Sequence, residues 1–327
     1  MKIGFCYDIC EDYGFDSVSL SFCDFTTEAA VSYVKNILEG CGYTVQLIGN
    51  YKKLIYLLEH GQFNCDLIFS TAEGIGSRNR EGWIPSLCEA FGIPFVGTDA
   101  YGLALTLDKV QTKLIARHLG IPTPDFYEVH HMEEWESAVS KLGFPMIVKP
   151  NAEGSSMGVS LVYNTQDLIN RLQDLLSKYK QKVLCETYLS GQELTTSVYV
   201  KQGSPIVFGM AESRDSNHKT MEIYSSQTKR IYGCKKILPQ ISEEESRLLH
   251  TYSIKLFNYI GCQDYCRMDF RKGKDNVINL LEVTPLPALS DTASFTAGGI
   301  LFGETAESIL KTIIENACLR HGLFPKS

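Results

Sequence analysis

The stretch from residue 144 to 163 constrains the fold more than any other part of the chain. The apolar run Phe144–Val148 is typical of a buried strand, and the alternation of Val159–Tyr163 predicts a second strand. Between them lies a loop rich in glycine and hydroxyl side chains, Lys149–Gly158 (KPNAEGSSMG). Backbone N–H groups of such a loop, with Lys149 beside them, are suited to cradle a polyphosphate. We therefore hypothesise that this strand–loop–strand unit is the lid of an ATP site.

Two other interpretations of this loop stay open. A Gly/Ser-rich turn between strands is often plain hairpin chemistry. The letters Gly154–Gly158 also match G-x-S-x-G, the nucleophile elbow of serine hydrolases, with Ser156 as the nucleophile. That elbow needs a helix directly after the serine, whereas a strand-like run follows here. A serine hydrolase is therefore a rival with less support.

Bulk composition excludes some classes of function. The chain has 327 residues, of which 44% are hydrophobic and 21% charged, and this length suggests two or three domains. A net charge of −7 disfavours a nucleic-acid partner, which usually needs a basic face. No apolar run approaches bilayer length, so we expect no membrane partner. The amino terminus is typical of a first strand rather than a signal peptide.

The eleven cysteines are scattered and odd in number. The pairs Cys6/Cys10 and Cys262/Cys266 have no histidine close by, which makes a zinc site improbable. Most of the others lie in apolar runs, where cysteine behaves as a small hydrophobe. This usage predicts a reducing compartment and a cytoplasmic location.

The first part of the chain alternates strands with helices. Strands are predicted at 2–7, 43–48 and 65–70, with helices at about 27–39 and 51–60. This order predicts a parallel α/β domain over residues 1–98, ending at a boundary near Gly97-Thr98-Asp99. No G-x-G-x-x-G follows the first strand, so a dinucleotide site has little support.

A charged loop follows the third predicted strand of this domain, at the sheet edge where ligands gather in parallel sheets. It carries four candidate substrate-binding residues: Glu73, Arg78, Arg80 and Glu81. A solvated loop is an equally supported alternative.

A helical stretch from about residue 103 to 119 opens the second predicted domain, 99–181, which would be the lid. Lys109 and Lys113 lie four residues apart on one face of it, and such pairs are usually solvated. The helix ends near Gly120, before Ile121-Pro122-Thr123-Pro124. After the loop, Asn164 is placed to cap a helix whose apolar face is Leu168, Leu172 and Leu176.

The third predicted domain, 182–327, is rich in strands. They are expected at 183–186, 194–200, 206–211, 265–270 and 277–283, with helices at 242–260, opened by a Ser242/Glu245 capping box, and at 304–321. The polar segment 213–230, which contains Lys229 and Arg230, is predicted to be a mobile loop. Gly298–Thr305 has Walker A spacing, but Glu304 replaces the lysine and would repel phosphate, so it is not a P-loop.

Two late strands carry an acidic constellation. Arg267 and Asp269 share one face because they are two residues apart, and so do Glu282 and Thr284. Carboxylates inside apolar runs are costly unless they are paired or metal-bound. Oxygen ligands suit Mg²⁺. A structural ion pair between Arg267 and Asp269 or Glu282 is the alternative, and the residues alone leave both open.

The motifs together resemble one family. Arg80-Glu81, the run Phe91–Gly97, Asp108-Lys109, Lys149-Pro150, Glu153–Ser156, Gly191-x-Glu193, Arg267-x-Asp269 and Leu281–Val283 occur in the order of the D-alanine–D-alanine ligase-like group of the ATP-grasp superfamily. The resemblance covers nearly the whole chain. It implies a mixed α/β fold of three domains: a parallel N-terminal domain, a small lid and an antiparallel catalytic domain. It also implies a homodimer, because the group is often dimeric.

The resemblance implies a role for each matching residue. Lys109 and Lys149 would contact phosphates, or adenine in the case of Lys149. Ser155 and Ser156, with Glu153 in the same loop, would close over the phosphates, and Lys229 would reach the γ-phosphate. Glu186 and Leu189 would meet adenine and Glu193 the ribose. Asp269 and Glu282, with Thr284, would hold one or two Mg²⁺ ions, or Mn²⁺, and Arg267 would steady the acyl phosphate.

The implied activity is ATP-dependent joining of a small carboxylate to an amine, with an acyl phosphate intermediate and release of ADP and phosphate. Cations would offset the repulsion between the carboxylate and the transferred phosphoryl group. The departures from the family lie at the substrate end. Thr284 and Thr71 replace asparagines, Arg230 replaces a tyrosine, and the turn 8–24 lacks the glycine-serine-glutamate signature.

We therefore expect amino-acid-like substrates other than two D-alanines. Arg78, Arg80 and Arg230 suggest an extra substrate carboxylate, and Ser294 is a further candidate contact. A degenerate member that binds nucleotide without turnover, motivated by Thr284, is the alternative.

Overall fold

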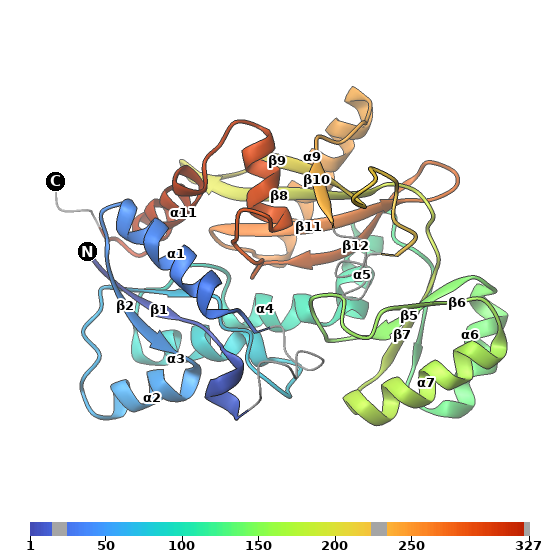
Figure 1. Ribbon diagram of the computed structural model, residues 1–327, viewed down its shortest axis with the longest axis horizontal. Coiled ribbons are helices and arrows are strands. Elements are labelled where there is room, and N and C mark those ends of the chain that lie inside the picture. The colour runs from blue at the N-terminus through green and yellow to red at the C-terminus, as the bar shows by residue number, and fades with distance from the viewer. Residues whose placement is uncertain (15–24, 224–233, 324–327) are drawn as a thin grey trace.

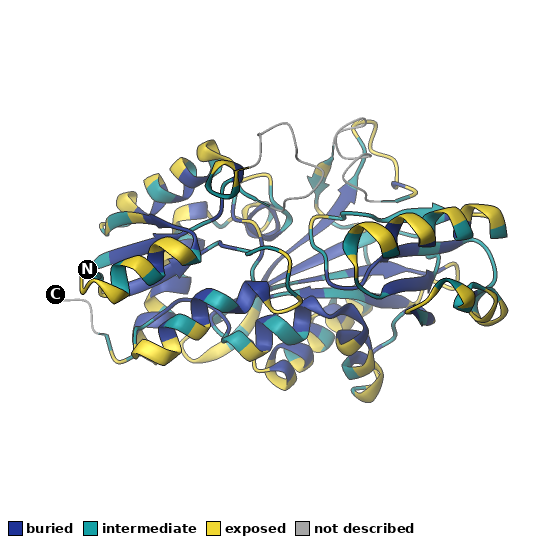
Figure 2. Ribbon diagram, turned by 90° about the horizontal axis from the view of Figure 1, so that it is seen from below, coloured by how far each residue is buried: buried dark blue, intermediate teal, exposed yellow. Residues whose placement is uncertain are grey.

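A computed structural model describes residues 1–14, 25–223 and 234–323, and it arranges them around three β-sheets. Figure 1 shows the N-terminal sheet on one side, the sheet that carries the glycine-serine loop on the other, and the large C-terminal sheet above and between them. The strands are buried, and the outer faces of the helices are exposed (Figure 2). Within the described part of the chain, no helix is long and apolar enough to cross a membrane.

The N-terminal sheet is parallel, with strand order β2-β1-β3, as the alternation of elements predicted. Its elements are β1 (Lys2–Cys6), α1 (Glu28–Gly40), β2 (Thr44–Gly49), α2 (Tyr51–Glu59), β3 (Leu67–Ser70) and α3 (Trp83–Phe91), with 3₁₀ turns η1 (Cys10–Tyr13) and η2 (Arg80–Gly82). Thr27 and Asn50 cap α1 and α2 through their side chains. The C-terminal helix α11 (Ala306–Arg320) shares one apolar core with α1. The two ends of the chain therefore meet in one unit.

The helical stretch after residue 99 is two helices, not one. α4 (Ala100–Leu107) and α5 (Lys109–His118) are separated at Asp108, whose backbone is extended. The Asp108 side chain accepts a hydrogen bond from the Gln111 amide and so caps α5. This break turns the start of α5, with Lys109, towards the glycine-serine loop.

The sheet that carries the glycine-serine loop, named the lid sheet below after its predicted role, is antiparallel, with strand order β4-β7-β5-β6. It comprises β4 (Phe126–Val129), β5 (Met146–Pro150), β6 (Ser160–Val162) and β7 (Val183–Thr187), with η3 (Met132–Glu134) and with α6 (Trp135–Leu142) and α7 (Thr165–Tyr179) packed against it. β4 was not predicted, since four residues after a proline-rich turn give too short a pattern. β7 pairs with β4 and β5, so the sheet extends beyond residue 181, where the sequence suggested a division. The three-way division of the chain remains a prediction.

The C-terminal sheet has the order β10-β9-β8-β11-β12 and is antiparallel throughout. It comprises β8 (Glu193–Lys201), β9 (Ser204–Arg214), β10 (Lys235–Ile237), β11 (Tyr265–Lys272) and β12 (Ile278–Thr284). Consecutive residues of β8 enter different cores: Val198 packs with residues of α9 (Glu243–Ile260), and Tyr199 shares a core with Phe295 of α10 (Ser294–Leu301). The helices therefore cover both faces, and α9 opens with the predicted Ser242/Glu245 capping box.

The first half of the segment with Walker A spacing, residues 298–301, lies in α10, a helix that was not predicted. A Cβ at Gly209 of β9 would lie 2.4 Å from the Gly298 carbonyl carbon. The glycines therefore let α10 lie directly on the sheet, which explains them without a phosphate.

Candidate functional site

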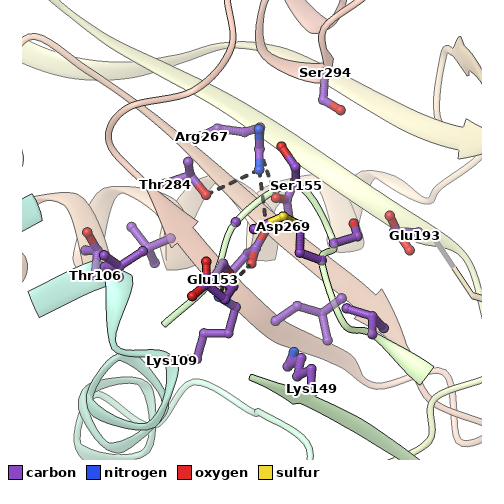
Figure 3. Close-up of a pocket in the computed structure, with 18 of the residues that line it drawn as sticks. Thr106, Lys109, Lys149, Glu153, Ser155, Glu193, Arg267, Asp269, Thr284 and Ser294 are labelled. Carbon is purple, nitrogen blue, oxygen red and sulfur yellow. Dashed lines mark hydrogen bonds and ion pairs between the residues drawn. The ribbon is translucent and has the colours of Figure 1, made fainter. Parts of the chain in front are cut away.

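A cavity of about 280 Å³ lies between the lid sheet and the C-terminal sheet and extends to the loop after β3 (Figure 3). Most of the predicted site residues line it: Glu73, Glu81, Lys109, Lys149, Glu153, Ser155, Ser156, Glu186, Leu189, Glu193, Arg267, Asp269, Glu282, Thr284 and Ser294. They come from segments more than 200 residues apart in the chain. Lys229 and Arg230 lie outside the described residues.

The acidic constellation forms as the alternation predicted. β11 and β12 place Asp269 opposite Glu282 and Arg267 opposite Thr284, with a β-bulge directly after Asp269. The Arg267 guanidinium donates to Asp269 Oδ2 at 2.8 Å, and its other end reaches Glu282 Oε1 and Thr284 Oγ1, both at 3.3 Å (Figure 3). Thr195 of β8 donates to Asp269 Oδ1 at 2.8 Å. Two carboxylates and one arginine thus share a single face of the sheet, at one wall of the cavity.

The two carboxylates of this constellation differ electrostatically. Burial raises the pKa of Asp269, and the opposing charge of Arg267 does not fully offset it. Burial would also raise the pKa of Glu282, but Lys109, Arg267 and Lys149 together lower it to about 2. Glu282 is therefore held as an anion by surrounding cations, whereas the charge of Asp269 is the less stabilised of the two. An additional cation at this point would be favoured.

The opposite wall is built on a buried ion cluster that the sequence did not reveal. Glu186 of β7 is 2% exposed, and its Oε1 lies 3.0 Å from the ammonium groups of both Lys113 and Lys149. Although its burial would raise the pKa of Glu186, the two lysines lower it. Lys113 is fully buried, so the interpretation of the Lys109/Lys113 pair as solvated is wrong. The signal was available in the apolar setting of Glu186, because a buried carboxylate needs cationic partners.

Lys109 links the two walls. Its ammonium donates to the backbone carbonyl of Glu153 in the glycine-serine loop and lies 3.9 Å from Glu282 Oε2. Burial lowers the pKa of Lys109, and the neighbouring Glu282 opposes that shift. The cation therefore lies where the lid loop and the acidic constellation approach each other.

The glycine-serine loop is the tip of a hairpin, because β5 and β6 pair antiparallel. Ser155 and Ser156 have φ values of 44° and 62°, in the left-handed region that non-glycine residues rarely adopt. Successive residues there turn backbone N–H groups toward the inside of a turn. A strand rather than a helix follows Ser156, so the nucleophile elbow of a serine hydrolase is not formed.

The loop after β3 divides into two parts. Glu73 and Glu81 line the cavity, whereas Arg78 is exposed and Arg80 does not line it. Ser294, which belongs to α10, also lines the cavity. Arg80 is buried instead: it donates to the Ala152 carbonyl at 2.7 Å, and its guanidinium lies 3.4 Å from Glu153. Arg80 therefore ties the N-terminal domain to the lid loop.

The cavity residues that sequence reasoning missed include Tyr188, Thr195, Ile223 and Arg271. Arg271 had a detectable signal, because it follows Asp269 by two residues and must share its face of β11. Thr195 and Tyr188 lie in runs with no distinguishing pattern. Ile223 enters the cavity only through tertiary structure.

The chain is similar in sequence to known proteins. Residues 115–315 match the family model described as the D-ala D-ala ligase C-terminus. The D-alanine–D-alanine ligase A of Bacillus cereus is 30% identical over 257 residues, which cover 76% of this chain and 82% of that protein.

Solved structures extend the likeness in fold to almost the entire chain. The D-alanine–D-alanine ligase of Bacillus anthracis in complex with ATP superposes with a TM-score of 0.76 at 22% identity, covering 98% of this chain and 99% of that one. The VanG D-Ala:D-Ser ligase of Enterococcus faecalis gives a TM-score of 0.74 at 20% identity, with 97% and 99% covered. The chain therefore shares the fold of these two structures over nearly its whole length.

Proposed function

This chain belongs to the D-alanine–D-alanine ligase family of ATP-grasp enzymes, which form a peptide bond, and we propose that it ligates a small amino-acid-like carboxylate to an amine at the expense of ATP. The carboxylate is activated as an acyl phosphate, the amine displaces phosphate, and ADP is released. The substrates differ from two D-alanines.

One observation carries this proposal: the acidic constellation and the lysine-bearing wall face a common cavity under the glycine-serine loop. Lys109 approaches both Glu282 and the loop carbonyl of Glu153. Lys149 lies 3.0 Å from Glu186, and both residues line the same cavity. A triphosphate placed between these walls would meet cations on the lid side and an oxygen-rich cation site on the sheet side. This is the charge arrangement that phosphoryl transfer requires.

The residues present fit a magnesium site of the kind that is completed by substrate. Within the described residues, no cluster of three or more His, Cys, Asp or Glu side chains is placed to hold a metal alone. Mg²⁺ usually takes one or two carboxylates and fills its shell with phosphate oxygens and water. Asp269 and Glu282 supply the two carboxylates, and the hydroxyl of Thr284 lies beside them. Bound there, Mg²⁺ would neutralise charge on the phosphates.

We assign the remaining roles from the positions of the side chains. Arg267 stands next to Glu282 and Thr284 and is placed to stabilise the negative charge that develops on the acyl group. Glu186 holds the Lys149 side chain in one orientation, so the Lys149 ammonium is already positioned when the nucleotide binds. The loop with Ser155 and Ser156 covers the cavity, and we assign it the exclusion of water from the intermediate.

The proposal of a changed specificity rests on the departures from the family at the substrate end, where Thr71 and Thr284 replace asparagines. Glu73 and Glu81 bring carboxylates to the cavity, where an amino group of a substrate would be favoured. Arg80 contacts the lid loop rather than the cavity, so an extra substrate carboxylate is no longer supported by that residue. The same fold serves a D-Ala:D-Ser ligase, which illustrates that the architecture does not fix the second amino acid.

The test is a screen of amino-acid pairs for ATP-dependent phosphate release, with mass spectrometry of the product. We expect ADP, phosphate and a dipeptide-like amide from at least one pair. Release of AMP and pyrophosphate would reject acyl-phosphate chemistry. Nucleotide binding without phosphate release from any pair would favour a degenerate, non-catalytic member.

A further inference from the structure

Arg271 of β11 contacts two separate segments, 191–193 and 221–222, at one end of the cavity. It lies opposite Glu193 in the antiparallel register of β11 and β8, and its Nη1 is 3.4 Å from Glu193 Oε2. Its Nε donates to the Gly191 carbonyl at 3.2 Å. Its Nη2 donates to the backbone carbonyls of Met221 and Glu222, at 2.5 and 2.8 Å. All three nitrogen atoms of the guanidinium thus donate hydrogen bonds.

These contacts are made in a protected place. Arg271 is 6% exposed, and its guanidinium carbon lies 5.8 Å from the centre of the Tyr188 ring. Charge-assisted hydrogen bonds in such surroundings are stronger and more directional than exposed ones. Gly191 and residues 221–222 lie in neither a helix nor a strand, and Glu193 is the first residue of β8. Arg271 therefore supplies order that secondary structure does not.

We propose that Arg271 is a positioning residue that fixes the Glu193 carboxylate and the 221–223 segment as one wall of the nucleotide pocket, and so sets the discrimination for ribose hydroxyls. The inference rests on the proposed ATP-dependent function. Glu193 is the carboxylate expected to accept the ribose hydroxyl hydrogens. Arg271 holds that carboxylate, and through Met221 and Glu222 it also holds Ile223 against the cavity.

A lysine does not reproduce this arrangement. Its ammonium is a point charge and does not donate along three directions of one plane, as a guanidinium does. The Arg271→Lys variant is expected to keep the charge beside Glu193 but to lose one or more of the carbonyl contacts. Arg271→Met keeps a similar length and apolar stem and removes every donor.

The chain provides a matched control on the next residue. Lys272 is also buried, at 7% exposure, and its ammonium lies 2.5 Å from Glu245 Oε1. Since successive residues of a strand point to opposite faces, Lys272 faces α9 and not the cavity. Lys272→Met removes a buried ion pair from the same strand without touching the nucleotide wall.

The experiment compares the Kd values of ADP and 2′,3′-dideoxy-ADP, measured by calorimetry with Mg²⁺ present. We expect the wild type to prefer ADP by about tenfold or more, because two hydroxyls lose hydrogen bonds to a charged group. Arg271→Met should raise the Kd of ADP by a similar factor and bring the ratio close to one. Arg271→Lys should be intermediate, and Lys272→Met should keep the wild-type ratio.

A double-mutant cycle with Glu193→Gln separates positioning from general damage. If Arg271 acts through Glu193, the double variant loses no more discrimination than either single variant. A wild-type ratio in folded Arg271→Met, or additive losses, would overturn the inference. If Arg271→Met does not fold, the ratio of Arg271→Lys decides in the same way. Failure of the wild type to bind ADP would instead overturn the proposed function itself.

Discussion

The ammonium of Lys113 lies 3.0 Å from Glu186 Oε1, behind the cavity wall that faces the acidic constellation, and neither residue is more than 2% exposed. Lys113 also donates to the Thr123 hydroxyl at 3.0 Å, so it reaches from α5 to the segment that leads into β4. Glu186 faces Lys149 at the same distance on its other side. The position of the cavity lysine is therefore set by a lysine that does not itself line the cavity.

Lys113 should make stability depend on pH above neutrality. Burial lowers the pKa of Lys113 to about 8, against 10.5 in an unfolded chain. Between these values the unfolded state binds the additional proton, so this residue makes the free energy of unfolding rise with pH. We expect the wild type to gain stability relative to Lys113→Met from about pH 8 toward 10.5. Chemical denaturation of both proteins across this range measures the difference, and a constant difference would contradict the prediction.

The acidic constellation should be needed for turnover and less so for nucleotide binding. Asp269→Asn and Glu282→Gln each remove a proposed cation ligand where phosphoryl transfer would build charge, so we expect phosphate release to fall by about 10²- to 10³-fold. The Kd of ADP without added metal should change by less than tenfold. Chelation of divalent metal should abolish wild-type turnover. Full activity in both variants would show that these carboxylates form only a structural ion pair.

Arg80 should affect ATP rather than the amino-acid substrates. It holds the lid loop through the Ala152 carbonyl and Glu153, and it does not line the cavity. We expect Arg80→Met to raise the KM for ATP by about tenfold, as the loss of a charged hydrogen bond predicts, and to leave the amino-acid KM nearly unchanged. Steady-state kinetics with each substrate varied in turn separates the two. A selective rise in the amino-acid KM would restore Arg80 as a substrate contact.

Gly209 should be intolerant of any side chain. A Cβ there would lie 2.4 to 2.5 Å from backbone atoms of Gly298 and Gly299, which cannot move without displacing α10. We expect Gly209→Ala to lower the free energy of unfolding by about 2 kcal/mol or more. Gly40→Ala is the control, since a Cβ at Gly40 at the end of α1 meets nothing within 4 Å. Urea denaturation of both variants gives the comparison, and equal stabilities would contradict the close-contact argument.

Local pattern was sufficient for much of the fold. The period-two alternation of β11 and β12 placed Arg267, Asp269, Glu282 and Thr284 on one face, because the pleat leaves no other choice. The capping residues and apolar spacing located α1, α2 and α9 to within a few residues. These features depend on neighbours in the chain, which the sequence displays directly.

Other features depended on contacts between distant segments. The local sequence did not predict the burial of Lys113, the contact of Arg80 with the lid loop, or the pairing of β7 with β4 and β5. The same letters suit a solvated helix face, a substrate loop or a strand of either sheet. Which of these occurs is decided by desolvation and by the partner that each group meets.

The amino-acid sequence alone was enough to predict the hairpin with the glycine-serine loop, the acidic face and the family resemblance, since each depends on adjacent or regularly spaced residues. The balance of Glu186 by two lysines, and the contacts of Arg271 with both Glu193 and the 221–222 backbone, became evident only from the folded arrangement. The physical reason is that a buried charge is stable only beside its counter-charge. That counter-charge comes from parts of the chain that the fold alone brings together.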